Sequence, residues 1–163
     1  MQNCGFNIFM RGTEMKRHIK FAVVYAVLAM VCGVFYREFT KAYDFTGDTA
    51  LGKLHTHLFI LGMVVFLLFA IFDGKFNLQK HRLYLPFIII YNAGVGLMCI
   101  MLAVRGICEV TGTDVSDGAI SGVAGLGHIL VAAGIILFFC MLLLTIKANE
   151  KSGKKDDGEE VAE

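Results

Sequence analysis

Three histidines lie inside long apolar segments of the chain. His55 and His57 belong to the sequence Leu54-His55-Thr56-His57, and His128 lies in a later apolar segment. An ionisable side chain in such surroundings is costly unless it binds a ligand or a polar partner, so these positions are the first candidates for function. Imidazole nitrogens are common ligands of haem iron, copper and zinc. We therefore expect a cofactor or metal site built from His55, His57 and His128.

Three further polar residues are candidates to contact a bound cofactor. Arg105 ends an apolar segment, where its guanidinium could bind haem propionates; lipid phosphate or Glu109 is the alternative partner. Tyr91 and Asn92 form a polar pair inside the same segment, with hydrogen bonding within the protein as the alternative role. Four glycines before His128 allow a flat macrocycle or another helix to approach closely: Gly118, Gly122, Gly125 and Gly127.

The spacing of the histidines predicts different neighbours for each ring. Positions two apart on a helix differ by about 200° around the axis, so His55 and His57 point to nearly opposite sides. The two rings of one helix therefore cannot readily hold one ion together. His18 and His81 lie among Lys and Arg residues, and we interpret them as parts of charged flanks.

The composition predicts an integral membrane protein. Hydrophobic residues make up 56% of the 163 residues, and they occur in four blocks close to the length needed to cross a bilayer: residues 21–39, 51–72, 83–104 and 119–146. We expect an all-α chain, with residues 19–147 forming an up-down bundle of four transmembrane helices. Residues 1–18 are interpreted as a cytoplasmic tail. Residues 148–163 alternate Lys with Asp and Glu, and we expect them to form a disordered cytoplasmic tail.

The distribution of basic residues predicts the orientation. Eleven of the fifteen Lys and Arg lie before the first span, between the second and third, or after the fourth. By the positive-inside rule both termini are cytoplasmic, and the end of the second span that carries His55 and His57 faces outward. The formal net charge of +1 argues against a nucleic-acid partner, which needs a basic surface.

Residues 54–62 resemble the start of the second transmembrane helix in the catalytic subunit of haem-copper oxidases, especially cbb-type oxidases and nitric oxide reductases. In that family a Leu-His-Thr segment supplies an axial haem ligand, and the tenth helix carries a His-x-His spacing. Its twelve helices form three arcs of four, so the resemblance implies that this chain is one free-standing arc. Three copies would let His55 of one subunit and His57 of the next flank a haem iron. The copper-site His-His dipeptide of the family has no counterpart here, which argues against oxygen reduction.

The chain as a whole resembles a group of bacterial four-helix membrane proteins in which four short motifs recur. The motifs are LHxH at residues 54–57, YNxG at 91–94, an Arg-Gly pair at 105–106 and GLGH at 125–128. This resemblance covers most of residues 51–144. It implies a multi-pass protein of the bacterial inner membrane, and it implies no particular activity.

We expect a b-type haem protein that transfers electrons or binds a diatomic gas, with His55 and His57 as axial ligands and His128 as a third ligand or hydrogen-bond partner. One alternative is a protein that binds or transports copper or zinc, with Met63, Met98 or Met101 as soft ligands. Another is a non-catalytic accessory subunit whose histidines only satisfy hydrogen bonds. The expected partners are membrane lipid, further copies of the chain in a homo-oligomer such as a trimer, and an electron-transfer partner that the sequence does not identify.

Overall fold

The computed structural model describes the backbone of residues 2–114 and 117–160 and the side chains of residues 16–114, 118 and 120–149. All regular elements in these residues are helical. Four helices are long and apolar enough to cross a membrane: Lys16–Ala42, Leu51–Phe76, Tyr84–Thr111 and Ile120–Asn149. The expected all-helical chain with four apolar helices is confirmed, and this architecture fits a multi-pass membrane protein.

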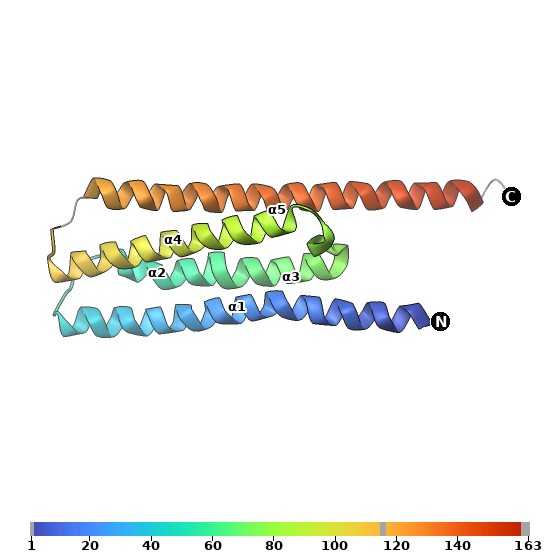
Figure 1. Ribbon diagram of the computed structural model, residues 1–163. Helices are drawn as coiled ribbons and strands as arrows, with labels where there is room; N and C mark the ends of the chain where they lie inside the picture. Colours follow the sequence, from blue (N-terminus) through green and yellow to red (C-terminus); the bar gives the residue numbers. More distant parts are fainter. Residues whose placement is uncertain (1, 115–116, 161–163) are drawn as a thin grey trace.

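The four long helices alternate in direction. Helix α1 covers Gln2–Ala42, α4 covers Tyr84–Thr111 and α5 covers Asp117–Glu160. Between α1 and α4 the chain is continuously helical through α2 (Leu51–His57), the π-helical segment η1 (Leu58–Val64) and α3 (Val65–Phe76), which together we call the second helix. A short 3-10 turn, η2 (Leu78–Lys80), leads into α4. As a result α1 begins and α5 ends at the same end of the molecule (Figure 1).

The outer two helices extend beyond the expected spans. Helix α1 begins at Gln2, so the segment interpreted as an N-terminal tail continues the first helix. Helix α5 continues to Glu160, and the prediction that residues 148–163 are disordered was therefore wrong up to that residue. Lys, Glu and Ala have high helix propensity, and adding residues to an existing helix costs much less than starting one.

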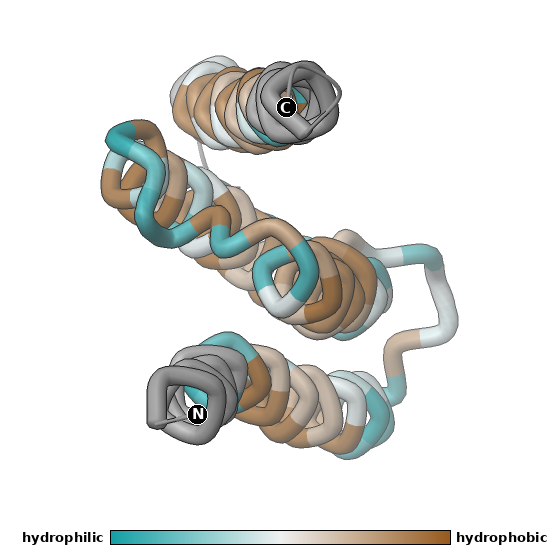
Figure 2. Tube along the Cα trace, turned by 90° about the vertical axis from the view of Figure 1, so that its right-hand side faces the viewer, coloured by the Kyte–Doolittle hydropathy of each residue, from teal (hydrophilic) through white to brown (hydrophobic). Residues whose placement is uncertain are grey.

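The helices form an open, zigzag layer in which each one packs mainly on its neighbours in sequence. Helix α1 packs on the second helix, the second helix packs on α4, and α4 packs on α5. Figure 2 looks along the helix axes and shows α1 and α5 on opposite outer sides, with the second helix and α4 between them. Each outer helix therefore leaves most of its surface to lipid or to another protein.

Glycines bring α4 and α5 into close contact. A Cβ at Gly94 would lie 2.7 Å from the backbone nitrogen of Val131, and a Cβ at Gly127 would lie 3.0 Å from the backbone nitrogen of Met98. Such distances leave no room for a side chain at Gly94. Because lipid tails are as apolar as the side chains, close packing of this kind is a main source of helix association in membranes.

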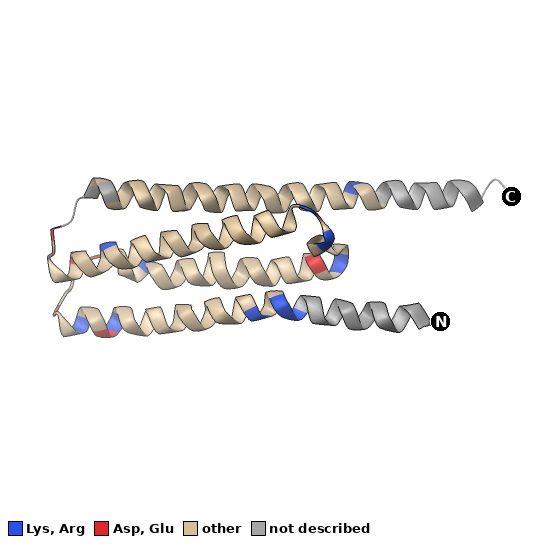
Figure 3. Ribbon diagram, in the orientation of Figure 1, with Lys and Arg blue, Asp and Glu red and all other residues tan. Residues whose placement is uncertain are grey.

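Charged residues gather at the two ends of the molecule (Figure 3). Basic residues dominate the end at which α1 begins: Lys16, Arg17, Lys20, Lys75, Lys80, Arg82 and Lys147. The opposite end mixes both signs: Arg37, Lys41, Lys53 and Arg105 with Glu38, Asp44, Asp48, Glu109 and Asp114. We refer to these as the basic end and the mixed-charge end.

Candidate functional site

His57 lies near the mixed-charge end of the second helix, and its side chain is half-buried. Its Nδ1 is 2.8 Å from the backbone carbonyl oxygen of Lys53. A carbonyl oxygen can only accept a hydrogen bond, so Nδ1 carries the proton, and in the neutral ring Nε2 has the free lone pair. Histidines that bind metals usually have the other ring N–H held by a carbonyl or carboxylate. His57 is thus held in the tautomer that can coordinate a metal through Nε2.

His128 on α5 has the same local arrangement. Its Nδ1 is 2.8 Å from the backbone carbonyl oxygen of Ala124, and its side chain is exposed. The neutral ring again presents an Nε2 lone pair to its surroundings. Two histidines on different helices are therefore held in the same ligand-competent tautomer.

Arg105 connects the helix faces on which these two histidines lie. Its Nη2 donates a hydrogen bond of 2.8 Å to the hydroxyl of Ser121, and with Lys53 it lines a pocket of about 480 Å³. His57 follows Lys53 by four residues and His128 follows Ser121 by seven, and both spacings keep residues on one face of a helix. The two histidines therefore lie below Arg105, His57 by about one helical turn from Lys53 and His128 by about two turns from Ser121.

We call this group the Arg105 surface: Lys53, His57, Arg105, Ser121 and His128.

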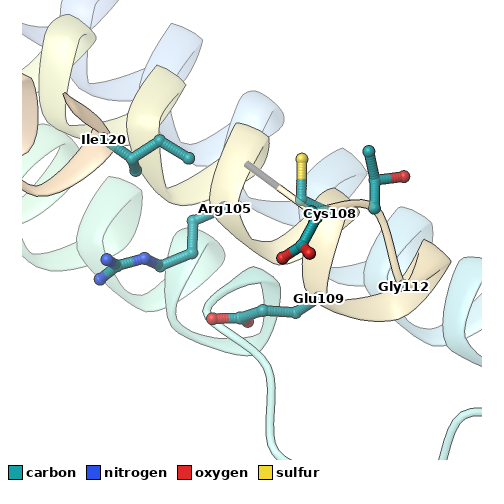
Figure 4. Close-up of a pocket in the computed structure, with 7 residues that line it drawn as sticks. Arg105, Cys108, Glu109, Gly112 and Ile120 are labelled. Carbon is teal, nitrogen blue, oxygen red and sulfur yellow. The ribbon is translucent and has the colours of Figure 1, made fainter. Parts of the chain in front are cut away.

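The acidic residue nearest to Arg105 along α4 has a role of its own. Arg105 and Glu109 both line a smaller pocket of about 290 Å³ at the mixed-charge end (Figure 4). One carboxylate oxygen of Glu109 accepts a hydrogen bond of 2.6 Å from the backbone nitrogen of Ala50. The carboxylate thereby satisfies a free N–H at the start of the second helix, where a negative charge is favourable. Lys53 and Arg105 supply positive charge beside this capped helix end.

His55 faces a different neighbour. A Cβ at Gly33 of α1 would lie 3.7 Å from Cγ of His55, so the imidazole packs against the first helix. Its Nδ1 is buried and has no hydrogen-bond partner. This agrees with the expectation that His55 and His57 of one chain serve different neighbours.

Tyr91 and Asn92 satisfy their hydrogen bonds inside the protein. The buried Tyr91 hydroxyl donates to the carbonyl oxygen of Leu61 at 2.8 Å. Asn92 accepts a hydrogen bond of 2.7 Å from the Tyr25 hydroxyl and donates one of 2.7 Å to the carbonyl oxygen of Ile88. These contacts connect α1, the second helix and α4, which fits the structural alternative for both residues.

The glycine run before His128 divides between two faces of α5. Gly127 packs against the backbone of α4 at Met98. A Cβ on any of three other glycines would meet no atom within 4 Å: Gly118, Gly122 and Gly125. One glycine thus serves helix packing within the chain, whereas the other three leave part of α5 free for a second molecule.

The sequence pattern of a family described as "Protein of unknown function (DUF2871)" matches residues 15–145. The chain belongs to this family. The match includes most of all four apolar helices. No curated protein and no solved structure matches the chain. The expected membership of a four-helix family is supported, whereas the resemblance of this DUF2871 protein to haem-copper oxidases stays a prediction.

The side chains described in the DUF2871 protein include no cluster of three or more His, Cys, Asp or Glu that could hold a metal ion. Of the three methionines considered as soft ligands, Met98 is fully buried in the core. His55, His57 and His128 thus do not form a three-histidine centre within one copy. The arrangement provides single imidazole ligands on separate helices.

The sequence interpretation of His18 was wrong. His18 is fully buried on α1, and its Nε2 lies 3.5 Å from Oδ2 of Asp73 on α3, which is 3% exposed. Three neighbouring basic residues suggested a charged flank, but the helix turns the imidazole toward the second helix. One signal in the sequence was available, because Asp73 is an acidic residue at the end of an apolar span and would require a partner there.

Proposed function

We propose that this protein binds b-type haem at the Arg105 surface and transfers electrons, with Nε2 of His57 and Nε2 of His128 as the two axial ligands. The carrying observation is that each ring holds its Nδ1 hydrogen on a carbonyl of its own helix, which leaves Nε2 for a ligand. Bound haem would supply the redox chemistry. Two imidazole ligands favour six-coordinate, low-spin iron, which suits electron transfer better than gas binding.

The contacts favour this pair over the sequence-based pair of His55 and His57. His55 packs on α1, whereas His57 shares a helix face with Lys53 next to Arg105. Within one copy the two imidazoles of the second helix point to different sides and cannot bind one iron from opposite faces. His57 and His128 come from two helices that both border Arg105, so their positions suit ligands on the two faces of one macrocycle.

Arg105 and Lys53 would hold the haem propionates. Both side chains line the pocket at the mixed-charge end, about one to two helical turns above the histidines. A guanidinium can donate two parallel hydrogen bonds to a carboxylate. The vinyl edge would then point toward the apolar middle of the protein, and the charged edge toward water.

We propose that both chain ends are cytoplasmic and that the protein lies in a bacterial inner membrane. The basic end supports this orientation, because Lys and Arg are enriched in cytoplasmic segments. The Arg105 surface then faces outward. The electron partner would therefore approach the haem from the outer side of the membrane.

We also propose that copies associate, with a trimer as the expected form. Gly118, Gly122 and Gly125 form an uncovered small-residue face on α5, and such faces let another helix approach closely. A second copy on this face would shield bound haem from lipid. Measurement of the molar mass in detergent tests this association, and a monomer would contradict it.

The decisive test of the function is the pigment of the overproduced protein. Membranes from cells with ample porphyrin supply, and protein purified from them in mild detergent, would be reduced with dithionite. We expect a Soret band, sharp α bands and about one non-covalent haem b per chain. Colourless protein carrying stoichiometric copper or zinc would support the metal alternative instead. Colourless protein without metal would support the accessory-subunit alternative.

A further inference from the structure

His18 and Asp73 are two ionisable side chains buried together at the basic end, far from the Arg105 surface. His18 is 0% exposed and Asp73 is 3% exposed. The imidazole contacts the rings of Phe69 and Tyr84 edge-on, with ring centroids 4.6 and 5.7 Å away. The pair joins α1 to the last turn of the second helix, and the proposed function does not use it.

The carboxylate of Asp73 is the better satisfied member of the pair. Its two oxygens accept hydrogen bonds of 2.9 and 3.0 Å from the backbone nitrogen and the side-chain amide of Gln79. Both ring nitrogens of His18, in contrast, have no hydrogen-bond partner, and Nε2 lies 3.5 Å from Oδ2 of Asp73. The hydrogen bonds from Gln79 favour an ionised carboxylate, which then requires a positive charge nearby.

Other polar groups at this site are already engaged. Arg17 of α1 donates hydrogen bonds of 2.8 Å to Gln79 and 2.9 Å to the hydroxyl of Tyr84 on α4. The Arg17 guanidinium also lies 5.3 Å from the centroid of the Tyr84 ring. Asp73 on α3, Arg17 on α1 and Tyr84 on α4 are thus the charged or titratable groups that contact the site around His18. Of these, Asp73 is the group that forms an ion pair with His18.

We propose that His18 and Asp73 form a proton-binding site whose single proton holds α1 against the second helix. With one proton the pair is neutral overall, either as imidazolium and carboxylate or as imidazole and carboxylic acid. Without it a negative charge remains buried among Phe69, Tyr84 and the helix backbones. An uncompensated buried charge is strongly destabilising, so loss of the proton loosens the contact between the two helices.

The consequence is a stability that depends on pH. At alkaline pH the folded protein retains a proton that the unfolded chain releases, so stability falls as the pH rises through the range in which the pair deprotonates. On the proposed orientation this site exchanges protons with the cytoplasm. The proton site itself does not depend on haem binding.

The test measures the thermal unfolding midpoint of the full chain in detergent between about pH 6 and pH 10, a range that spans the titration of an ordinary histidine and beyond. We expect the wild-type midpoint to fall as the pH rises. Asp73→Asn removes the charge that needs the proton, so its midpoint should change little over this range. His81→Gln is the matched control and should keep the wild-type slope. An Asp73→Asn profile parallel to the wild-type profile would overturn the proposal.

A second readout follows His18 directly. In protein with 15N-labelled histidine, His18→Gln identifies the His18 signal by its disappearance. We expect this signal to report a protonated ring to higher pH in the wild type than in Asp73→Asn. Should Asp73→Asn fail to fold, the double variant His18→Gln/Asp73→Asn replaces both charges, and it should fold with a flat pH profile. A His18 signal that titrates identically with and without the carboxylate, or a double variant with the wild-type slope, would overturn the proposal.

Discussion

The hydroxyl of Tyr91 on α4 donates a hydrogen bond of 2.8 Å to the carbonyl oxygen of Leu61, which lies in the π-helical segment of the second helix. A π-helical turn shifts the backbone hydrogen bonds from the i−4 to the i−5 carbonyl, and such turns are frequent near functional sites. This segment begins directly after His57. Tyr91 therefore stabilises an irregular stretch of backbone next to the proposed haem ligand.

Tyr91→Phe removes this hydrogen bond and keeps the ring. We expect it to lower the free energy of unfolding by about 0.6 to 1.7 kcal/mol, the range measured for hydrogen bonds between membrane helices. Unfolding by SDS in mixed micelles would measure the change. Tyr43→Phe, at an exposed tyrosine, is the control and should have little effect. Equal stability of the two variants would show that the Tyr91 bond contributes nothing.

Gly94 and Gly96 give a matched pair for the contact between α4 and α5. Gly94→Ala would place Cβ 2.7 Å from the backbone nitrogen of Val131, whereas Cβ at Gly96 would meet no atom within 4 Å. We expect Gly94→Ala to cost about 1 to 3 kcal/mol through overpacking. Gly96→Ala should be neutral or slightly stabilising. The same unfolding assay decides, and the packing of α5 on α4 would be contradicted by two variants of equal stability.

The orientation can be tested with reporters fused at the two ends of the helices. A fluorescent protein attached after Lys147 should be bright, because the proposed site is cytoplasmic. Alkaline phosphatase inserted after Gly47, in the loop between α1 and the second helix, should be active outside the cytoplasm. The reverse pattern would place the Arg105 surface in the cytoplasm and contradict the proposed topology.

Arg105→Gln tests the propionate contact. Loss of a charged hydrogen bond costs about 1.5 to 3 kcal/mol, which corresponds to roughly 10- to 100-fold weaker haem retention. Transfer of haem to excess apomyoglobin would measure this change. Arg37→Gln removes an exposed arginine at the same end and should leave retention unchanged. Equal haem loss in both variants would mean that Arg105 does not bind the cofactor.

The long-range hydropathy pattern was sufficient to predict four helices, because crossing a membrane requires about 20 consecutive apolar residues. Helical spacing also predicted that His55 and His57 have different neighbours. The pairing of His18 with Asp73 could not be read from local sequence, since it depends on how α1 packs against the second helix. The π-helical segment was also missed, because residues 58–64 carry no residue type that marks such a turn.

The grouping of His57, Arg105 and His128 likewise required the tertiary structure. Spacing within a helix identifies which residues share a face, but it does not say which neighbouring helix that face meets. Only the hydrogen bond from Arg105 to Ser121 and the pocket shared with Lys53 connect the two faces. For the same reason the sequence could not decide between His55 and His128 as partner of His57.

The most direct test of the central claim is the spectrum of three single-histidine variants. Oxidised protein would be studied by electron paramagnetic resonance, and dithionite-reduced protein by optical absorption. The account predicts a low-spin bis-histidine signal in the wild type and in His55→Ala, and loss of that signal in both His57→Ala and His128→Ala. A wild-type spectrum in His128→Ala together with its loss in His55→Ala would contradict the account.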